Sequence, residues 1–241
     1  VEILRRGDSA LDLVINLVEG ERSYAGKINV TGNAILSSED ILKEVRMRQG
    51  DVYSPSLLGE DRSRIRKRYG ENGYLDARIV AIRKPNLETG RIDVTFDLTE
   101  NNKFTVNSIL VRGNDKTRTI AIVRELALAP SEIFDLRRME TSEARLRNTR
   151  FFERVTLDDE PIATDDPEIQ RSRRNLVVNV KEGRTGHVSF GVGFSTLEKA
   201  MMFAEFRQGN FDLFRWRGPH KLQGDGQKFR LRLKLGARSS E

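Results

Sequence analysis

Cysteine is absent from the 241 residues, and histidine occurs only twice, at His187 and His220. The absence of cysteine excludes disulfide scaffolds and any zinc or redox site built on thiolates. Neither histidine has a neighbour at metal-ligand spacing, and a His-based triad lacks the partners that it needs. The sequence therefore predicts no metal site, no cofactor and no catalytic residue, and we expect that the protein is not an enzyme.

Long apolar runs are also missing. No stretch approaches the roughly 18 apolar residues that a transmembrane helix needs. The sequence begins at Val1 without Met and without the apolar segment of a signal peptide. We expect the chain to be a piece of a longer protein or a processed product.

Positive charge is present mainly at the C-terminal end. Residues 200–241 contain nine Lys or Arg against four Asp or Glu, which accounts for +5 of the formal net charge of +6. The sequence pI of 9.7 is therefore mostly a property of that segment. This uneven charge weakens any inference that a generally basic surface binds nucleic acid.

An internal repeat organises the chain as far as Gly183. The sequence VTGN at 30–33 matches VRGN at 111–114, and Tyr53 matches Phe134 at the same offset. Strand-like segments end at Glu19, Glu100 and Glu182, and their spacing equals that offset to within one position. A shared period in three markers indicates a tandem array.

Each repeat predicts the order β-α-α-β-β. Ser37 or Ser38 is a candidate N-cap, and Pro55 suits the first position of the next helix. In the first repeat the expected elements are Gly26–Val30, a helix from Ser38, a helix from Pro55 to Asn72, Tyr74–Arg83 and Arg91–Thr99. In the second they are Thr105–Val111, helices Thr119–Leu126 and Leu136–Asn148, Phe151–Leu157, a loop over 158–174 and Leu176–Glu182.

From Gly186 onward the pattern is that of strands alone. The residues from Phe229 to Leu235 alternate strictly between apolar and basic side chains, and the residues from His187 to Phe194 alternate less strictly. Strict alternation without helical patterning is typical of transmembrane barrel strands. Three strands cannot close a barrel, so most of it must lie outside this sequence.

With these features in view, the chain resembles the BamA-type outer-membrane protein assembly factors. The resemblance is carried by VRGNDKTR at 111–118, IVREL at 122–126, RLRNTRFFERV at 145–155 and VKEG at 180–183. It departs from the family where Asn148–Phe151 stands in place of Leu-Gly-Tyr-Phe. The family's Val-Arg-Gly-Phe motif belongs to a late barrel loop. The similar residues Val111–Asn114 are not that motif, because they lie at the end of a strand of the repeat.

The resemblance implies an α+β fold of tandem β-α-α-β-β POTRA modules, followed by antiparallel β strands of an incomplete transmembrane β-barrel. Residues 1–19 would end a preceding POTRA, 20–101 and 102–184 would be two POTRA modules, and 185–241 the first barrel strands. It implies a role in outer-membrane β-barrel assembly and insertion, in the outer membrane of a Gram-negative-type bacterium with the POTRA portion in the periplasm. The implied partners are unfolded outer-membrane proteins, accessory outer-membrane lipoproteins and outer-membrane lipid.

The family's strand order implies the candidate sites, because the strand after the second helix lies at the sheet edge. Open edges can receive an extended partner strand, although a merely solvated or capped edge is the alternative. The expected client edges are Asp76, Ala77, Arg78, Ile79, Val80, Ala81, Ile82, Arg83, Val155, Thr156 and Leu157, with the second edge extending to Glu160. The expected barrel seam strand is His187, Val188, Ser189, Phe190, Gly191, Val192, Gly193 and Phe194.

Other functions remain as alternatives. A two-partner secretion or translocation pore of the same superfamily, or a structural POTRA protein without a barrel, would share the repeats. An RNA-binding KH module needs a Gly-x-x-Gly loop between its helices, and neither repeat has one, so no nucleic-acid partner is expected. The acidic residues within 158–166 lack calcium-loop spacing and favour a solvated loop. The basic run within 62–68 is a solvated helix face or a dock for an acidic partner or lipid head groups.

Overall fold

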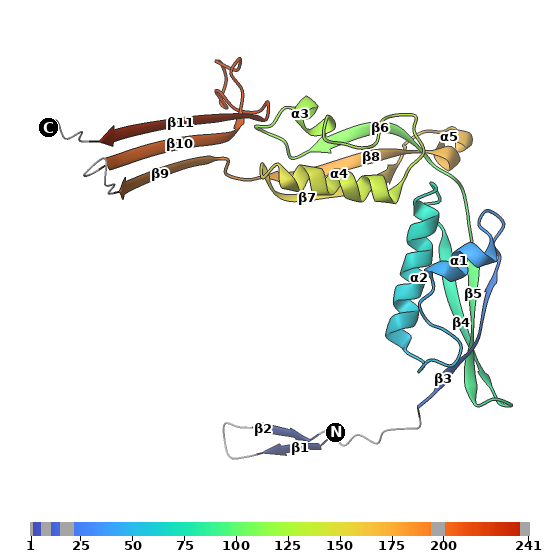
Figure 1. The fold of residues 1–241 in the computed structure, drawn as a ribbon. Coiled ribbons are helices and arrows are strands. Elements are labelled where there is room, and N and C mark those ends of the chain that lie inside the picture. The colour runs from blue at the N-terminus through green and yellow to red at the C-terminus, as the bar shows by residue number, and fades with distance from the viewer. Residues whose placement is uncertain (1, 6–10, 15–21, 194–200, 237–241) are drawn as a thin grey trace. The chain divides into compact units, whose positions relative to one another are not determined.

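The computed structural model describes residues 2–5, 11–14, 22–193 and 201–236. The chain divides into two compact units, Val1–Ile65 with Ile79–Leu98 and Arg66–Arg78 with Thr99–Glu241. The first strands, β1 (Glu2–Arg5) and β2 (Leu11–Val14), form an antiparallel pair (Figure 1). The rest of the strand predicted up to Glu19 lies outside the described residues.

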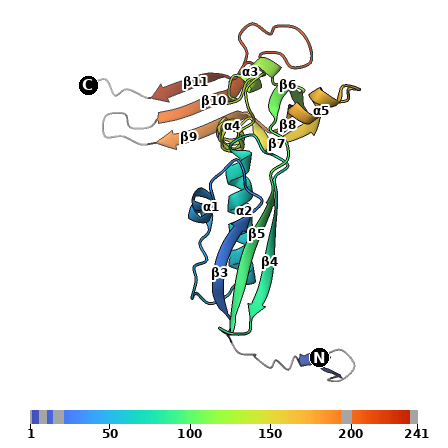
Figure 2. The same ribbon diagram turned by 90° about the vertical axis from the view of Figure 1, so that its right-hand side faces the viewer.

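The first repeat has the predicted order of strands and helices. Its sheet has the strand order β3-β5-β4, and β3 runs parallel to β5. Val94, Phe96 and Leu98 alternate along β5 as buried residues, while the helices α1 and α2 lie along the sheet (Figure 2). The elements are β3 (Tyr24–Thr31), α1 (Ser38–Glu44), α2 (Pro55–Gly70), β4 (Arg78–Asn86) and β5 (Arg91–Thr99).

The second repeat has the same sheet order, β6-β8-β7, with β6 parallel and β7 antiparallel to the central β8. The register shift between Val106 and Ile109 on β6 repeats the shift between Ala25 and Ile28 on β3, at the offset that separates VRGN from VTGN. The elements are β6 (Thr105–Arg112), α3 (Thr119–Val123), α4 (Leu136–Asn148), β7 (Phe152–Pro161), α5 (Pro167–Ser172) and β8 (Arg173–Glu182).

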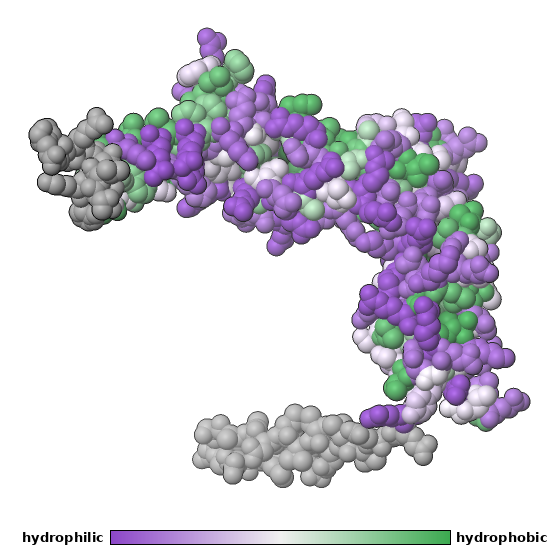
Figure 3. Space-filling view, in the orientation of Figure 1, coloured by the Kyte–Doolittle hydropathy of each residue, from purple (hydrophilic) through white to green (hydrophobic). Residues whose placement is uncertain are grey.

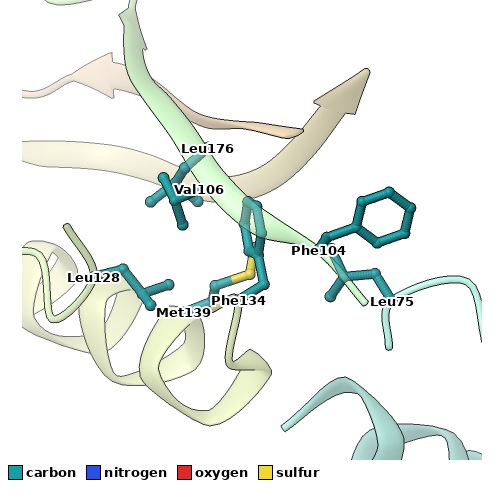
Figure 4. Packing of buried hydrophobic residues seen from close by; sticks show 7 residues of the cluster. All are labelled: Leu75, Phe104, Val106, Leu128, Phe134, Met139 and Leu176. Atoms are coloured by element: carbon teal, nitrogen blue, oxygen red, sulfur yellow. The ribbon is translucent and has the colours of Figure 1, made fainter. Parts of the chain in front are cut away.

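Two hydrophobic clusters form the core of this second repeat. One is built around Phe134, Met139 and Leu176, and Figure 4 shows its members. The other lies beside it, around Ile122, Leu146 and Val178. Because Phe134, the counterpart of Tyr53, is fully buried, the aromatic marker of the repeat is a core residue in this copy.

Polar contacts also repeat. The Asn33 side chain donates to Leu36 O (2.8 Å) and Ser38 Oγ (3.2 Å), and the Asn114 side chain donates to Thr117 O (3.0 Å) and Thr119 Oγ1 (3.2 Å). The glycine before each Asn has a positive φ, 77° at Gly32 and 84° at Gly113. The VTGN and VRGN markers are therefore one turn, used twice, in which Asn binds the chain that leads into the next helix.

A buried acceptor on the second helix ends the first helix in both repeats. Asp61 accepts from the backbone N–H of Arg46 (2.9 Å) and Met47 (3.1 Å). Ser142, which occupies the position of Asp61 in the second repeat, accepts from the N–H of Ala127 (2.8 Å) and donates to Arg138 O (2.7 Å). In both repeats a side chain of the second helix therefore holds the segment that follows the first helix.

Three boundaries predicted from the sequence were wrong. The helix predicted to Leu126 ends at Val123, because the N–H groups of Glu125 and Leu126 make i→i−3 bonds and the N–H of Ala127 bonds to Ser142. The strand predicted from Tyr74 begins at Arg78, after a turn in which Ala77 N donates to Tyr74 O. The loop predicted over 158–174 contains the end of β7, the helix α5 capped by Asp166, and the start of β8.

The remaining strands form a third sheet in the order β11-β10-β9, all antiparallel. They are β9 (Gly186–Gly193), β10 (Met201–Phe211) and β11 (Gln227–Gly236). The sheet is open, which fits the first strands of an incomplete barrel. None of the helices in the described part of the chain has the length and apolar content needed to cross a membrane.

Gly113 tests the repeated turn. A Cβ at Gly113 would clash with Val180 O, whereas a Cβ at Gly50, also at positive φ, meets nothing. We expect Gly50→Ala to lower the free energy of unfolding by the backbone strain alone, about 1–3 kcal/mol, and Gly113→Ala to lower it further. Urea unfolding of the chain in detergent, followed by circular dichroism, measures both. Equal losses would contradict the packing assigned to Gly113.

Ser142 tests the buried acceptor. Ser142→Ala leaves the N–H of Ala127 without a partner, at a cost of about 1–3 kcal/mol, so exchange of that amide should speed up about 5- to 150-fold. Ser63→Ala is the control, because Ser63 only donates to Gly59 O and its side chain is exposed. Hydrogen–deuterium exchange of Ala127 should be unchanged in the control. Unchanged exchange in Ser142→Ala as well would refute the capping role.

Candidate functional site

Three edge strands carry the residues predicted as sites. Strand β4 ends the sheet β3-β5-β4, β7 ends β6-β8-β7, and β9 ends β11-β10-β9. Among the described residues, each of these strands pairs with one neighbour only. Each therefore has one row of backbone N–H and C=O groups directed away from its sheet.

The structure places most, but not all, of the predicted edge residues in these strands. Residues 78–83 lie in β4, and Val155–Leu157 with Asp158–Glu160 lie in β7. Asp76 and Ala77 do not, because they precede β4 in a turn. The carbonyl of Asp76 accepts from Asn101 (2.8 Å), and its carboxylate pairs with Arg174.

The edge of β7 carries charge. Glu153 pairs with Lys181 on the neighbouring β8 (2.7 Å), and the hydrogen bond from Lys181 lowers the pKa of Glu153. Further along, the acidic residues predicted to form a solvated loop are paired: Asp159 with Arg174, and Glu160 with Arg112 (2.7 Å). No cluster of three metal-binding side chains occurs in the described ranges. Charged edges of this kind discourage indiscriminate strand pairing.

Strand β9 includes seven of the eight residues predicted for the barrel seam. His187–Gly193 lie in β9, and Phe194 lies outside the described residues. Only three residues separate the end of β8 at Glu182 from the start of β9 at Gly186. The central strand of the second repeat thus leads almost directly into an edge strand of the third sheet.

The third sheet has two chemically distinct faces. On the polar face, Glu205 pairs with Arg207, Arg230 and Arg232 from β10 and β11. The opposite face, the apolar face, is exposed. The register pairs Phe190 with Ala204 and Ala204 with Leu233, so the face consists of Val188, Phe190, Val192, Met202, Ala204, Phe206, Phe229, Leu231, Leu233 and Leu235.

A turn over residues 113–119, here the Thr117 turn, is held by Glu182 at the end of β8. The Glu182 carboxylate accepts from the N–H of Lys116 (2.9 Å) and of Thr117 (2.6 Å). Glu182 and Gly183 lie where the second repeat leads into the strands that follow. The N–H of Gly183 donates to Phe151 O (2.8 Å), so both residues are bonded back onto the second repeat.

The long loop between β10 and β11, residues 212–226, sits on the Thr117 turn. Asn210, just before the loop, donates from its side chain to Thr117 Oγ1 (2.8 Å), and both side chains are buried. The N–H of Arg118 donates to Gly224 O (2.9 Å), and Arg215 donates to Lys116 O (2.8 Å). Turn and loop together line a hollow of about 730 Å³.

Sequence reasoning missed this contact between turn and loop. The sequence alone allows residues 211–227 to be either an ordinary strand connection or an insertion. The signal was local: Gly224 and Gly226 take positive φ values of 124° and 75°, which glycine adopts most readily. A glycine-rich stretch between alternating strands predicts a turn with a defined backbone conformation. It does not indicate that this turn contacts residues 116–118.

A second polar contact lies at the end of α2. Glu71 accepts from Arg137 of α4 (2.9 Å) and from Arg68 (3.1 Å). Burial by itself would raise the pKa of Glu71, but the hydrogen bonds from the two arginines outweigh burial and lower it. From the basic run within 62–68, Lys67 also pairs with Glu140 (2.6 Å). Part of that run therefore makes ion pairs within the chain rather than facing solvent alone.

Comparison with known proteins supports the family. The chain is 32% identical over 182 residues to the "Outer membrane protein assembly factor BamA" of Nitratidesulfovibrio vulgaris, covering 74% of this chain and 22% of that protein. It is 26% identical over 197 residues to the protein of the same name from Neisseria meningitidis, covering 81% and 24%. The chain thus spans about a quarter of the length of these curated relatives.

Solved structures show the same fold. The crystal structure of BamA from Haemophilus ducreyi lacking POTRA domains 1–3 matches 90% of this chain and 37% of that one, with a TM-score of 0.71 and 19% identity. The POTRA3–5 fragment of BamA from Haemophilus influenzae matches 68% and 63%, with a TM-score of 0.60 and 20% identity. The family model POTRA, "Surface antigen variable number repeat", matches residues 23–101 and 104–183. The chain therefore belongs to the POTRA family.

Proposed function

We propose that this chain is part of an outer-membrane β-barrel assembly factor. In this proposal the two repeats lie in the periplasm of a Gram-negative-type cell, where they bind unfolded outer-membrane proteins and accessory lipoproteins. Strands β9–β11 begin a transmembrane barrel with the apolar face toward lipid. The names of the curated relatives and the exposed apolar face both support this assignment.

The observation that carries the proposal is the direct passage from POTRA to open sheet. Three residues join β8 to β9, and the Thr185 carbonyl between them accepts from the N–H of Gly209 on β10 (2.9 Å). The Thr185 hydroxyl also bonds to the Gln208 side chain (2.8 Å). A client bound at the POTRA is thus held by a module that continues into the edge strand β9.

Clients would bind through their backbone. An extended client segment can add to the outer side of β4 or β7, where the unpaired N–H and C=O groups bind any sequence able to form a strand. This mode suits unfolded outer-membrane proteins, because their future barrel strands share alternation rather than a common sequence. The charged pairs on β7, such as Glu153 with Lys181, would then orient a client rather than bind it tightly.

Strand β9 would be one side of the barrel seam. Its free edge offers backbone N–H and C=O groups to an incoming strand. Gly191 and Gly193 lie on the polar face of β9 and add no side chain to it. Gly191 packs so closely against the Phe203 ring that a Cβ there would clash with the ring. No nucleotide is required in this mechanism, because apolar transfer into lipid and completion of backbone hydrogen bonds both favour insertion. The proposed role is therefore non-catalytic.

Proline substitution tests the edges. Successive N–H groups of a strand point in opposite directions. One of the two variants Val80→Pro and Ala81→Pro therefore removes an outward N–H of β4, and the other removes an N–H that bonds to the neighbouring strand of the sheet. Leu157→Pro and Thr156→Pro form the equivalent pair on β7. Loss of one backbone hydrogen bond to a client, worth about 0.5–1.5 kcal/mol, should reduce photo-crosslinking to unfolded outer-membrane proteins roughly two- to tenfold.

The crosslinking is measured in cells that express the gene product carrying this chain. Within each pair, the variant that keeps a wild-type melting curve reports on the outward edge, and the other serves as the folding control. Unchanged crosslinking in both folded variants would exclude client binding at β4 and β7.

A further inference from the structure

The long loop displays large apolar side chains to solvent. Phe214 is 79% exposed and Trp216 is 65% exposed, and Leu213 before them is also exposed. Trp216 is the single tryptophan of the protein. Large aromatic side chains grouped in this way on a surface mark a binding site for an apolar or amphipathic partner.

The loop lies at the aromatic end of the apolar face. Phe206 and Phe229 of that face lie with ring centroids 6.2 Å apart, and Phe229 stacks on Phe211, the last residue of β10, at 5.0 Å. The face away from the loop is mostly aliphatic, with Val192, Met202 and Leu235 aligned across the strands. A change from aliphatic to aromatic residues is the pattern found where a membrane-spanning surface meets the lipid head groups.

The acidic groups of the loop face the second repeat. The Asp212 carboxylate lies 3.5 Å from Arg118 and is almost fully buried, and the Asp225 carboxylate lies 4.0 Å from the same guanidinium. Of the loop's basic residues, Arg215 donates to Lys116 O of the Thr117 turn, whereas Arg217 and Lys221 are exposed. The outward surface therefore combines aromatic rings with positive charge, which complements the phosphates of anionic lipid.

The loop is ordered before any partner binds. Its two ends are held by the hydrogen bonds to the Thr117 turn, and Leu222 N closes the loop on Arg215 O (2.7 Å). Phe214 and Trp216 are therefore held at the surface, and little ordering entropy is left to lose on binding. Figure 3 shows hydrophobic surface on the sheet β9–β11 and on the loop that projects from it.

We infer that the long loop is a lipid anchor, in which Phe214 and Trp216 enter the boundary between head groups and acyl chains while Arg217 and Lys221 bind lipid phosphate. The leaflet is the one beside the second repeat, because the loop and the β8–β9 junction lie at the same end of the strands. The inference rests on the proposed function only in taking β9–β11 as membrane strands. Through the Thr117 turn, the anchor would fix the height of the last POTRA above the membrane.

Trp216 is the only tryptophan of these 241 residues, so it reports on the anchor directly in the full gene product once any tryptophan outside this chain is replaced by Phe. The protein is reconstituted into vesicles of phosphatidylethanolamine and phosphatidylglycerol that contain lipids brominated near the head group or near the chain end. We expect strong quenching of Trp216 by the shallow bromines, weak quenching by the deep ones and poor quenching by acrylamide in the water. Quenching by acrylamide with no effect of bromine would place the loop in water or against protein, and would overturn the inference.

The basic residues are tested by lipid selectivity. We compare quenching of Trp216 by brominated phosphatidylglycerol with quenching by brominated phosphatidylcholine. Each of Arg217→Gln and Lys221→Gln should lower this preference for phosphatidylglycerol roughly fivefold, because each basic residue contributes about 1 kcal/mol to the attraction to anionic lipid. Arg66→Gln, the same charge change on exposed α2, should not lower it. An unchanged preference in the double variant would refute phosphate binding by these residues.

A label on the strands separates the anchor from the proposed function. Because these 241 residues contain no cysteine, Leu233→Cys on the apolar face carries a single fluorophore in the full gene product once any cysteine outside this chain is replaced by Ser. Deep quenching of that fluorophore without quenching of Trp216 would overturn the anchor and keep the membrane strands. Loss of both signals would overturn both.

Discussion

The bond between the Glu182 carboxylate and the two N–H groups of the Thr117 turn is the interaction on which the C-terminal part of the structure depends. Charge-assisted bonds to backbone N–H groups are short and strong, and they hold the turn in one shape. That shape presents Thr117 to Asn210 and the Lys116 carbonyl to Arg215. The long loop can therefore dock on the second repeat, and the end of β10 is held beside the β8–β9 junction.

The two repeats are built on one scaffold. Both have the Asn turn, the same register shift in the first strand and a buried acceptor on the second helix. In the first repeat the acid that ends the closing strand, Glu100, accepts from the Tyr69 hydroxyl (2.7 Å). Burial is the largest cause that raises the pKa of Tyr69, and the hydrogen bond to Glu100 raises that pKa further. In the second repeat the terminal acid, Glu182, holds the Thr117 turn on which the long loop docks.

Much of the fold could be predicted because its signals are local. Ser37 caps α1 by accepting from the N–H of Asp40, Pro55 begins α2, and α4 has the bounds that apolar spacing predicts. The strict alternation after Phe229 likewise predicted β11 and its two faces. These features need only neighbours in sequence, or the fixed period of the repeat.

The remaining features depend on residues far apart in the chain. Ser142 holds the segment after α3, and the distant pair Thr117 and Asn210 sets the place of the long loop. No local propensity encodes such pairings, because they arise only when separate elements pack. The client edges were predicted from a resemblance. The structure shows that β4 and β7 are edge strands, and client binding at them is a proposal.

The central claim, that this chain serves the assembly of many barrel proteins, is tested most directly by depleting its gene product and quantifying the outer-membrane proteome. The account predicts a several-fold fall of many unrelated β-barrel proteins together, because backbone recognition at β4, β7 and β9 does not select one sequence. Loss of a single secreted protein, with other barrel proteins at normal levels, would contradict it and identify a dedicated transport pore instead.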